Sequence, residues 1–481
     1  MKFFKLGLVI AGLVMTTHAT ADTWTPILGI PEPSFGVAED NPTLPSPWDQ
    51  EVSGFYYVCP SCSGSSNRSY GTPQQPRNSV PSNPSSGDVI VMAGSFSSGI
   101  DVNFNCTAQS PCFMLGDPAN RPQITGSSDF GGSYYIVDNL QVAVAPGQYA
   151  FSAGVRGSYG AFRNGVISGT PDQGGTVTGG SNIVLFQNEI RDNGDVNASG
   201  DQDRHGVKVS GNNIWLIGNE FARNSGDGVQ VGDIGTRSST HHIYIGGNTA
   251  HGNKQTGFWV KEAEHVIISQ NLSYDHDSSN SSDGEGMGGQ YDARYLWFLF
   301  NEIRDNRGGI GFKSSNNGGG NNFHVVGNYI HDNINSGYDT GNAWSTSAIA
   351  SWNGADITIV NNTVTGNTAG INLNGNTGDA YIYNNSIKNM QLGNAQEIFA
   401  ADQGDVAYEN YNAFDGDEVI DTGTAPVAAR DPYAIFEATY GISIAYDFDQ
   451  KSRPIRQWDI GAFEADGTGG VRPNPPVLLN D

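Results

Sequence analysis

A short apolar segment that ends in asparagine recurs through the middle of this 481-residue chain. Neighbouring segment-ending asparagines lie between 23 residues (271 − 248) and 34 residues (362 − 328) apart. The segments span residues 183–188, 214–219, 243–248, 266–271, 296–301, 323–328, 357–362 and 380–385. Repeats of this length are typical of solenoid proteins, because a single repeat cannot bury its apolar side without a neighbour on either side.

Two further sequence features recur with the same spacing as these segments. Five residues after most of them comes a second asparagine, and a glycine then opens another short alternating segment. The second asparagines are Asn193, Asn224, Asn253, Asn306, Asn333 and Asn367, and the glycines are Gly206, Gly228, Gly257, Gly286, Gly309 and Gly370. We expect stacked coils in which each asparagine sits at a left-handed corner and its amide bonds to its equivalents above and below.

The sequence therefore predicts an all-β, single-domain parallel β-helix (a solenoid) over residues 86–390. Residues 22–85 are rich in Pro, Ser and Gly and form the predicted N-terminal cap region. Residues 391–481 form the predicted irregular C-terminal cap and Pro-rich tail.

The N-terminal sequence and the net charge predict the location of the protein and the partners that it does not bind. Lys2 and Lys5, the apolar run 6–15 and the small residues 19–21 predict a signal peptide over residues 1–21, and hence a secreted protein, extracellular or periplasmic. The apolar run is too short to span a bilayer, so we expect no membrane association. The net charge is 24 − 49 = −25, which argues against nucleic acid as a partner. We expect a monomer.

Four cysteines fit an oxidising compartment, where disulfides are the default and a zinc site is the alternative. They are Cys59, Cys62, Cys106 and Cys112, and the sequence leaves all three possible pairings open.

Alternation along the segments that follow the glycines predicts which side chains point outward. Valine and phenylalanine alternate there with polar residues, which should form two columns on one outer face. The first column is Lys208, Gln230, Trp259, Gly288 and Gly311, and the second is Ser210, Gly232, Lys261, Gln290 and Lys313. Amine, aromatic and amide groups on one face predict a sugar-binding surface. Tyr291 and Arg294 follow Gln290 and could supply a proton donor and a carboxylate clamp.

Loops rich in acidic residues precede these segments. Asp203, Asp227, Asp283 and Glu285 stand there and are suited to Ca²⁺, which takes six to eight oxygen ligands. The alternative is that a protein of this charge has acid in every loop. His276 takes the place of an expected asparagine in a turn that we expect to be solvated, so it is a candidate acid, base or ligand.

A bound metal cation beside a lysine side chain could carry out β-elimination of a uronic-acid polymer. A metal ion neutralises the carboxylate, and a lysine near bound cations has its pKa lowered enough to remove the C5 proton. The candidate bases are Lys261, Lys313 and Lys208.

The asparagine repeats, the opening segment 86–94 and the closing segment Trp458–Glu464 resemble those of right-handed parallel β-helix proteins, among them secreted bacterial polysaccharide lyases. In layout the chain is similar to polysaccharide lyase family 9, which is pectate-lyase-like. That resemblance implies aspartate-bound Ca²⁺ and a lysine base on successive coils. Residues 203–206 and 226–228 are similar to the first two metal-bearing coils, whereas Trp259 stands where the family has its lysine and Lys261 comes two positions later.

Three functions remain open at this stage. The first is a Ca²⁺-assisted lyase acting on an acidic polysaccharide such as alginate, pectate, ulvan or a glycosaminoglycan. The second is a glycoside hydrolase that uses paired carboxylates, either Asp283 with Glu285 or Asp203 with Asp227. The third is a carbohydrate-binding solenoid without catalytic activity.

Overall fold

The structure is a computed structural model. It describes residues 26–144, 151–169, 174–313, 321–334, 347–352, 356–374, 378–392, 397–400, 406–417, 419, 422–424, 430–454 and 458–465. The predicted signal peptide and the Pro-rich tail from residue 472 lie outside these ranges.

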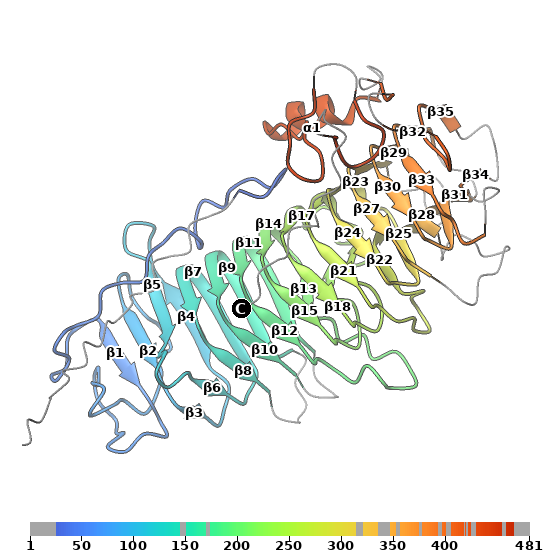
Figure 1. The fold of residues 1–481 in the computed structure, drawn as a ribbon. Coiled ribbons are helices and arrows are strands. Elements are labelled where there is room, and N and C mark those ends of the chain that lie inside the picture. Colours follow the sequence, from blue (N-terminus) through green and yellow to red (C-terminus); the bar gives the residue numbers. More distant parts are fainter. Residues whose placement is uncertain are drawn as a thin grey trace, which may run out of the picture.

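The chain forms an elongated solenoid of parallel strands, with β1 at one end and β35 near the other (Figure 1). Each coil passes through three faces, and each strand pairs in parallel with its equivalent in the next coil. The predicted right-handed parallel β-helix is confirmed. Strand pairing runs from β1 to β35 and so reaches past residues 86 and 390 at the two ends.

The first face, called the groove face below, carries the strands that follow the glycines. These strands are β4 (Asp101–Asn105), β13 (Val207–Val209), β16 (Val229–Val231), β19 (Phe258–Lys261), β22 (Glu285–Gln290), β25 (Gly308–Lys313), β28 (Ser347–Trp352), β31 (Ala369–Asn374) and β34 (Ile398–Ala400).

The second face, called the covered face, carries β1 (Phe55–Val58), β2 (Val89–Met92), β5 (Cys112–Gly116), β14 (Asn212–Ile217), β17 (His241–Gly246), β20 (Glu264–Ser269), β23 (Arg294–Leu299), β26 (Asn321–Val326), β29 (Ile357–Val360), β32 (Ala380–Tyr383) and β35 (Val406–Asn410). Three long strands bend from the groove face into the covered face: β7 (Ser128–Asp138), β9 (Ala153–Arg163) and β11 (Thr176–Phe186).

The third face is a separate sheet of short strands. It carries β3 (Ser95–Phe96), β6 (Gln123–Ile124), β8 (Gln141–Ala143), β10 (Val166–Ser168), β12 (Glu189–Arg191), β15 (Glu220–Ala222), β18 (Thr249–His251), β21 (Leu272–Tyr274), β24 (Glu302–Arg304), β27 (Tyr329–His331), β30 (Thr363–Thr365) and β33 (Ser386–Lys388).

The core fills the interior of the coils, as the alternation predicts. The inward residues of β13, β16, β19 and β25 are all buried in one apolar cluster. They are Val207, Val209, Val229, Val231, Phe258, Val260, Ile310 and Phe312. Because period-two alternation puts neighbours on opposite sides of a strand, the residues between them must face outward.

Two ladders of asparagine side chains connect the coils inside the molecule. Most ladder asparagines donate their backbone N–H and side-chain amide to the Oδ1 of the asparagine one coil further on, as Asn219 does to Asn248 at 2.8 and 3.0 Å. The predicted amide ladder is confirmed. The left-handed conformation, however, belongs to the preceding residue, such as Gln187 or Gly218, and not to the buried asparagine itself.

His276 occupies a rung of the second ladder, so the expectation that it lies in a solvated turn is wrong. Its side chain is buried, its backbone N–H donates to Asn306, and its Nδ1 accepts the backbone N–H of Asn253. Burial lowers the pKa of His276 to about 3. The ring is therefore neutral and replaces an asparagine amide in the ladder.

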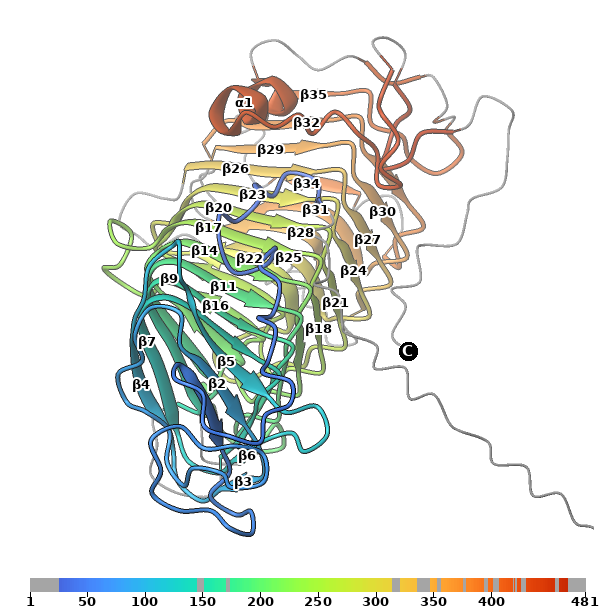
Figure 2. The same cartoon turned by 90° about the vertical axis from the view of Figure 1, so that its left-hand side faces the viewer.

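Segments from both termini pack on the covered face. Residues 28–41 run along this face between the coil of β23 and that of β7 (Figures 1 and 2), and Trp215 donates its indole N–H to the carbonyl of Pro31 at 2.7 Å. The helix α1 (Pro432–Tyr440) places Phe436 edge-on against Trp297 at 4.8 Å between ring centroids. Outward apolar side chains of this face are thus buried in a second cluster that these segments complete.

The four cysteines form the disulfides Cys59–Cys62 and Cys106–Cys112, near the N-terminal end of the solenoid. The alternative of a zinc site is excluded by this pairing. Within the described ranges, the structure contains no helix with the length and apolar character needed to cross a membrane.

Candidate functional site

Strand pairing places the two predicted outer columns in register. Lys208 pairs with Gln230, Gln230 with Trp259, and Trp259 with Gly288 on successive strands of the groove face. In the second column, Lys261 pairs with Gln290 and Gln290 with Lys313. Because neighbouring strands lie about 4.8 Å apart, Lys261 and Lys313 are held about 10 Å from each other along the backbone.

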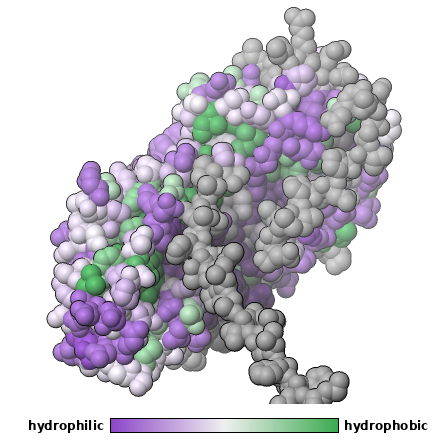
Figure 3. Space-filling model, turned by 60° about the vertical axis from the view of Figure 1, so that its left-hand side comes forward, coloured by the Kyte–Doolittle hydropathy of each residue, from purple (hydrophilic) through white to green (hydrophobic). Residues whose placement is uncertain are grey.

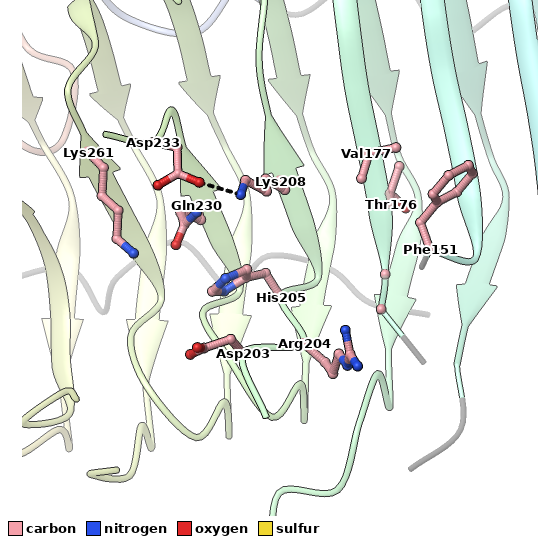
Figure 4. A pocket seen from close by; sticks show the side chains of 12 residues that line it. Phe151, Thr176, Val177, Asp203, Arg204, His205, Lys208, Gln230, Asp233 and Lys261 are labelled. Atoms are coloured by element: carbon pink, nitrogen blue, oxygen red, sulfur yellow. Dashed lines mark hydrogen bonds and ion pairs between the residues drawn. The ribbon is translucent and has the colours of Figure 1, made fainter. Parts of the chain in front are cut away.

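A hollow of about 390 Å³ lies over the strands β11, β13, β16 and β19 of this face. Figure 4 shows its residues, which come from successive strands and from the loop before β13. Its lining includes Thr176, Arg204, His205, Lys208, Gln230, Asp233 and Lys261. The amine of Lys261 points toward the part of the hollow where Gln230 and His205 lie.

Two of the three long cations in this hollow form no ion pair with a residue that the structure describes. The Nζ of Lys208 pairs with Asp233 at 2.7 Å. Arg204 and Lys261, in contrast, form no side-chain hydrogen bond or ion pair with a described residue, although the charge of Lys261 lowers the pKa of Asp227 and of Asp233. Unpaired cations in one hollow of a protein with a net charge of −25 mark the place where an anionic group is best accommodated.

A buried polar atom without a partner also faces this hollow. The Gln230 side chain is 2% exposed, and its Nε2 donates to the carbonyl of Gly232 at 3.3 Å. Its Oε1 lacks a hydrogen-bond partner among the residues that the structure describes. Buried polar groups are normally paired, so this oxygen is suited to a hydroxyl group of a ligand.

His205 and Asp227 form a pair at the edge of the hollow. The Nδ1 of His205 accepts the backbone N–H of Asp227 at 2.9 Å, which places the proton of the neutral ring on Nε2. A protonated ring would instead donate to the Asp227 carboxylate, whose Oδ2 lies 3.3 Å away. Burial raises the pKa of Asp227, but His205, Thr256 and the charge of Lys261 outweigh burial and lower it. Asp227 is therefore held as a carboxylate.

A second hollow of about 190 Å³ adjoins the first, with Asp203 and Lys261 common to both. Asp227, Trp259, Gln290, Tyr291 and Lys313 also line it. Asp203 accepts a hydrogen bond from Gln255 at 2.7 Å. The two hollows together make one polar groove that crosses the coils from β11 to β25.

Lys313 is tied to acidic residues, unlike Lys261. Its Nζ lies 3.0 Å from Glu285 and 3.2 Å from Asp283, and it sits over the Trp259 ring at 5.2 Å. Burial lowers the pKa of Lys313, but the charges of Glu285 and Asp283 outweigh it and raise the pKa. A lysine held in its charged form is a poor base, so among the three predicted lysines Lys261 is the best placed.

Only some of the predicted sugar-contacting residues are available to a ligand. Gln290 and Tyr291 line the second hollow, as expected for residues that contact a ligand. Trp259 points outward but is buried, because its ring lies over Gly288, where a Cβ would come within 2.2 Å of it. Arg294 is paired with Asp292 at 3.0 Å, so its guanidinium already has a carboxylate to clamp.

The predicted calcium ligands do not meet at one point. Asp203 and Asp227 line the second hollow, whereas Asp283 and Glu285 both form ion pairs with Lys313. No set of three or more His, Cys, Asp or Glu side chains that could hold a metal ion occurs among the described residues. The side chains as arranged do not fit a bound Ca²⁺, and calcium remains a prediction from the sequence.

Sequence reasoning missed Arg204 and His205 as site residues. The signal that could have found them is their position directly before the outward-facing residues of β13.

Comparison with known proteins supports the fold. Residues 205–387 match the family described as right handed beta helix region. No curated protein sequence matches the chain. Among solved structures, the pectate lyase Pel9A is 15% identical, with a TM-score of 0.46, over 86% of this chain and 98% of that one.

Two other solved structures are also similar. The PL6 family alginate lyase AlyGC is 14% identical, with a TM-score of 0.46, over 81% of this chain and 57% of that one. The GH136 lacto-N-biosidase from Eubacterium ramulus is 14% identical, with a TM-score of 0.42, over 75% of this chain and 67% of that one. The chain thus spans just over half the length of the alginate lyase. Such identities are too low to transfer a substrate or a catalytic residue.

Proposed function

We propose that this protein is a secreted polysaccharide lyase that cleaves a uronic-acid polymer by β-elimination in the groove over β11 to β25. The observation that carries the proposal is the presence in one hollow of two cations, Arg204 and Lys261, that form no ion pair with a described residue. A polyanion needs such cations to bind to a protein of net charge −25.

The roles follow from what each side chain can do. Arg204 pairs with the uronate carboxylate, which makes the C5 proton more acidic, since a guanidinium matches a carboxylate in geometry. Lys261, as the neutral amine, takes that proton, the C4–C5 double bond forms, and the bond from C4 to the bridging oxygen breaks. The bridging oxygen then needs a proton, which Tyr291 or the Nε2–H of His205 can supply. The Oε1 of Gln230 accepts a hydrogen bond from a sugar hydroxyl.

Calcium enters the proposal as a separate question. Asp203 and Asp227 both line the second hollow, but the described side chains do not form a Ca²⁺ site there. No step above depends on it.

The experiment is absorbance near 235 nm with the purified mature protein and a panel of uronate polymers, each with Ca²⁺ and with a chelator. Unsaturated ends absorb there, so a rise identifies a lyase and its polymer together. Lys261→Ala should lower kcat by a factor on the order of 10² to 10⁴, the contribution of a positioned base. A rise that the chelator removes would assign the metal a part in the reaction.

Two variants serve as controls. Lys261→Arg keeps the positive charge but offers no base at neutral pH, so it should bind the polymer and not cleave it. Lys388→Ala removes a lysine on the third face, whose amine donates to the carbonyl of Asp417, and should leave activity unchanged. New reducing ends without a rise in absorbance near 235 nm would show that the protein is a hydrolase and not a lyase. Binding of a polymer without either product would show that it is a carbohydrate-binding solenoid.

A further inference from the structure

We infer that the groove face carries a second binding region, made by Trp352, Asn372 and Phe399, which takes uncharged sugar units of the same polymer. The inference deepens the proposed function, since it concerns the polymer that the groove would bind. It implies that the natural ligand is a heteropolymer of uronate and neutral sugars.

The three residues are placed by the strand register. Lys313 pairs with Trp352, Ala350 pairs with Asn372, and Asn372 pairs with Phe399 on successive strands. All three therefore face outward on the same side as Lys261. With about 4.8 Å per strand, Trp352 lies about 14 Å from Lys261 along the solenoid axis, and Phe399 about 24 Å.

Both aromatic side chains are exposed where the rest of the face buries its apolar groups. Trp352 is 40% and Phe399 is 41% exposed, whereas Trp259 on the same face is 4% exposed. Trp352 and Phe399 stand in the two neighbouring outward columns of this face. Exposed aromatic rings on one face offer flat apolar surfaces, and the C–H faces of sugar rings pack on such surfaces.

The amide between these rings lacks hydrogen bonds. Asn372 is 2% exposed, and neither its Nδ2 nor its Oδ1 has a hydrogen-bond partner among the described residues. It lies between the inward residues Ile371 and Leu373, which are in the core, so its side chain points to the outer face. An unpaired buried amide costs stability that a ligand hydroxyl could recover, since a hydroxyl both donates and accepts.

Charge separates this region from the groove over β11 to β25. The strands β28, β31 and β34 contain no Lys or Arg, whereas β13, β19 and β25 each contain a lysine. A uronate bound over β28 to β34 would find no strand cation to pair with. Aromatic and amide groups without cations select neutral sugars, and the two regions together select a polymer that contains both kinds of unit.

The test is affinity electrophoresis of the mature protein in native gels that contain either polygalacturonate, in which every unit is charged, or gellan, in which glucuronate alternates with neutral sugars. Trp352→Ala and Phe399→Ala should each weaken retention by gellan by about threefold to tenfold. Asn372→Leu, which removes the amide at similar size, should also weaken it. Retention by polygalacturonate should change by less than twofold in each variant.

Tyr411→Ala is the matched control, because Tyr411 is an aromatic residue with 43% exposure outside the strands of the groove face. It should change neither retention. Equal retention of wild type and all three variants by gellan, or a wild-type protein that gellan does not retain, would overturn the inference. This readout needs no catalysis, so a failure of the lyase proposal, seen as no product near 235 nm, is distinguishable from a failure here.

Discussion

The groove face and the covered face are built from successive strands of the same coils and yet have opposite surfaces. On the covered face, outward tryptophan and tyrosine residues such as Trp215 and Tyr244 are buried by segments from the two ends of the chain. On the groove face from β13 to β25, most outward residues are lysines, amides and glycines, and hollows lie over them. In the view of Figure 3, apolar colour is confined to separate patches within a largely polar surface.

The difference shows that the interior does not decide which face of a solenoid is available to a ligand. The inward residues are apolar on both faces and belong to one core. What differs is whether the outward residues are covered by the chain itself. Outward aromatic residues therefore contribute stability on one face, and outward cations are left for binding on the other. Each of the following predictions tests this division.

The largest expected effect is on the covered face. Trp297→Ala should lower the free energy of unfolding by about 3–5 kcal/mol, because it empties a site between His324, stacked at 3.7 Å, and Phe436 of α1. Urea unfolding of the purified variant measures the loss. The folded fraction should keep wild-type binding to the polymer, and a loss of binding with normal stability would contradict the division of roles.

A second prediction concerns the asparagine ladder and pH. The folded state holds His276 at a pKa of about 3, below the ordinary value of 6.5, so the unfolded state binds a proton first as pH falls. The stability that the neutral ring contributes is complete above pH 6.5 and is lost as pH falls toward 3. By pH 5 the loss should reach about 2 kcal/mol.

The variant His276→Asn restores the ladder residue and should remove this part of the pH dependence. Comparing the free energies of unfolding of wild type and variant at pH 7.5 and pH 5 gives the difference. Polymer binding and any catalytic rate at pH 7.5 should be the same in both proteins. A large loss of catalytic rate in the variant would show that His276 is a functional residue.

The smallest effect is expected in the groove. Arg204→Ala should weaken polymer binding by about fivefold to tenfold and leave the melting temperature unchanged, since this guanidinium has no described ion pair to lose. Because salt screens charge pairs, the difference from wild type should shrink as ionic strength rises. Arg223→Ala, which breaks an exposed pair with Asp192 on another face, is the control and should show no salt-dependent change in binding.

Much of the fold follows from the sequence because its determinants are local and periodic. Alternation in β13, β16 and β19 was enough to place Lys208, Gln230 and Trp259 in one column, and the strand pairs agree. The ladder was readable because asparagine recurs at nearly fixed spacing. These patterns fix which way a side chain points.

They do not fix what lies next to it. Trp259 and Lys313 point outward as expected, but the missing side chain at Gly288 lets the tryptophan lie flat, and two acidic residues then hold Lys313. The covering of Trp297 by α1 joins parts of the chain more than a hundred residues apart, which no repeat encodes. His276 was misjudged because a histidine in a ladder position reads in sequence as a break in the pattern.

The asparagine ladder also gives the solenoid a direction. Asn219 donates its backbone N–H and one amide proton to Asn248, in the coil on its C-terminal side. It donates only one amide proton toward the N-terminal side, to the carbonyl of Leu185. Removing coils from the C-terminal side would orphan two buried donors per ladder, whereas removing them from the N-terminal side would orphan one. Buried donors without partners are rare in proteins. A shortened version of this protein is therefore better made by removing coils from the N-terminal end. A lengthened version is better made by inserting coils on the N-terminal side of an intact C-terminal end.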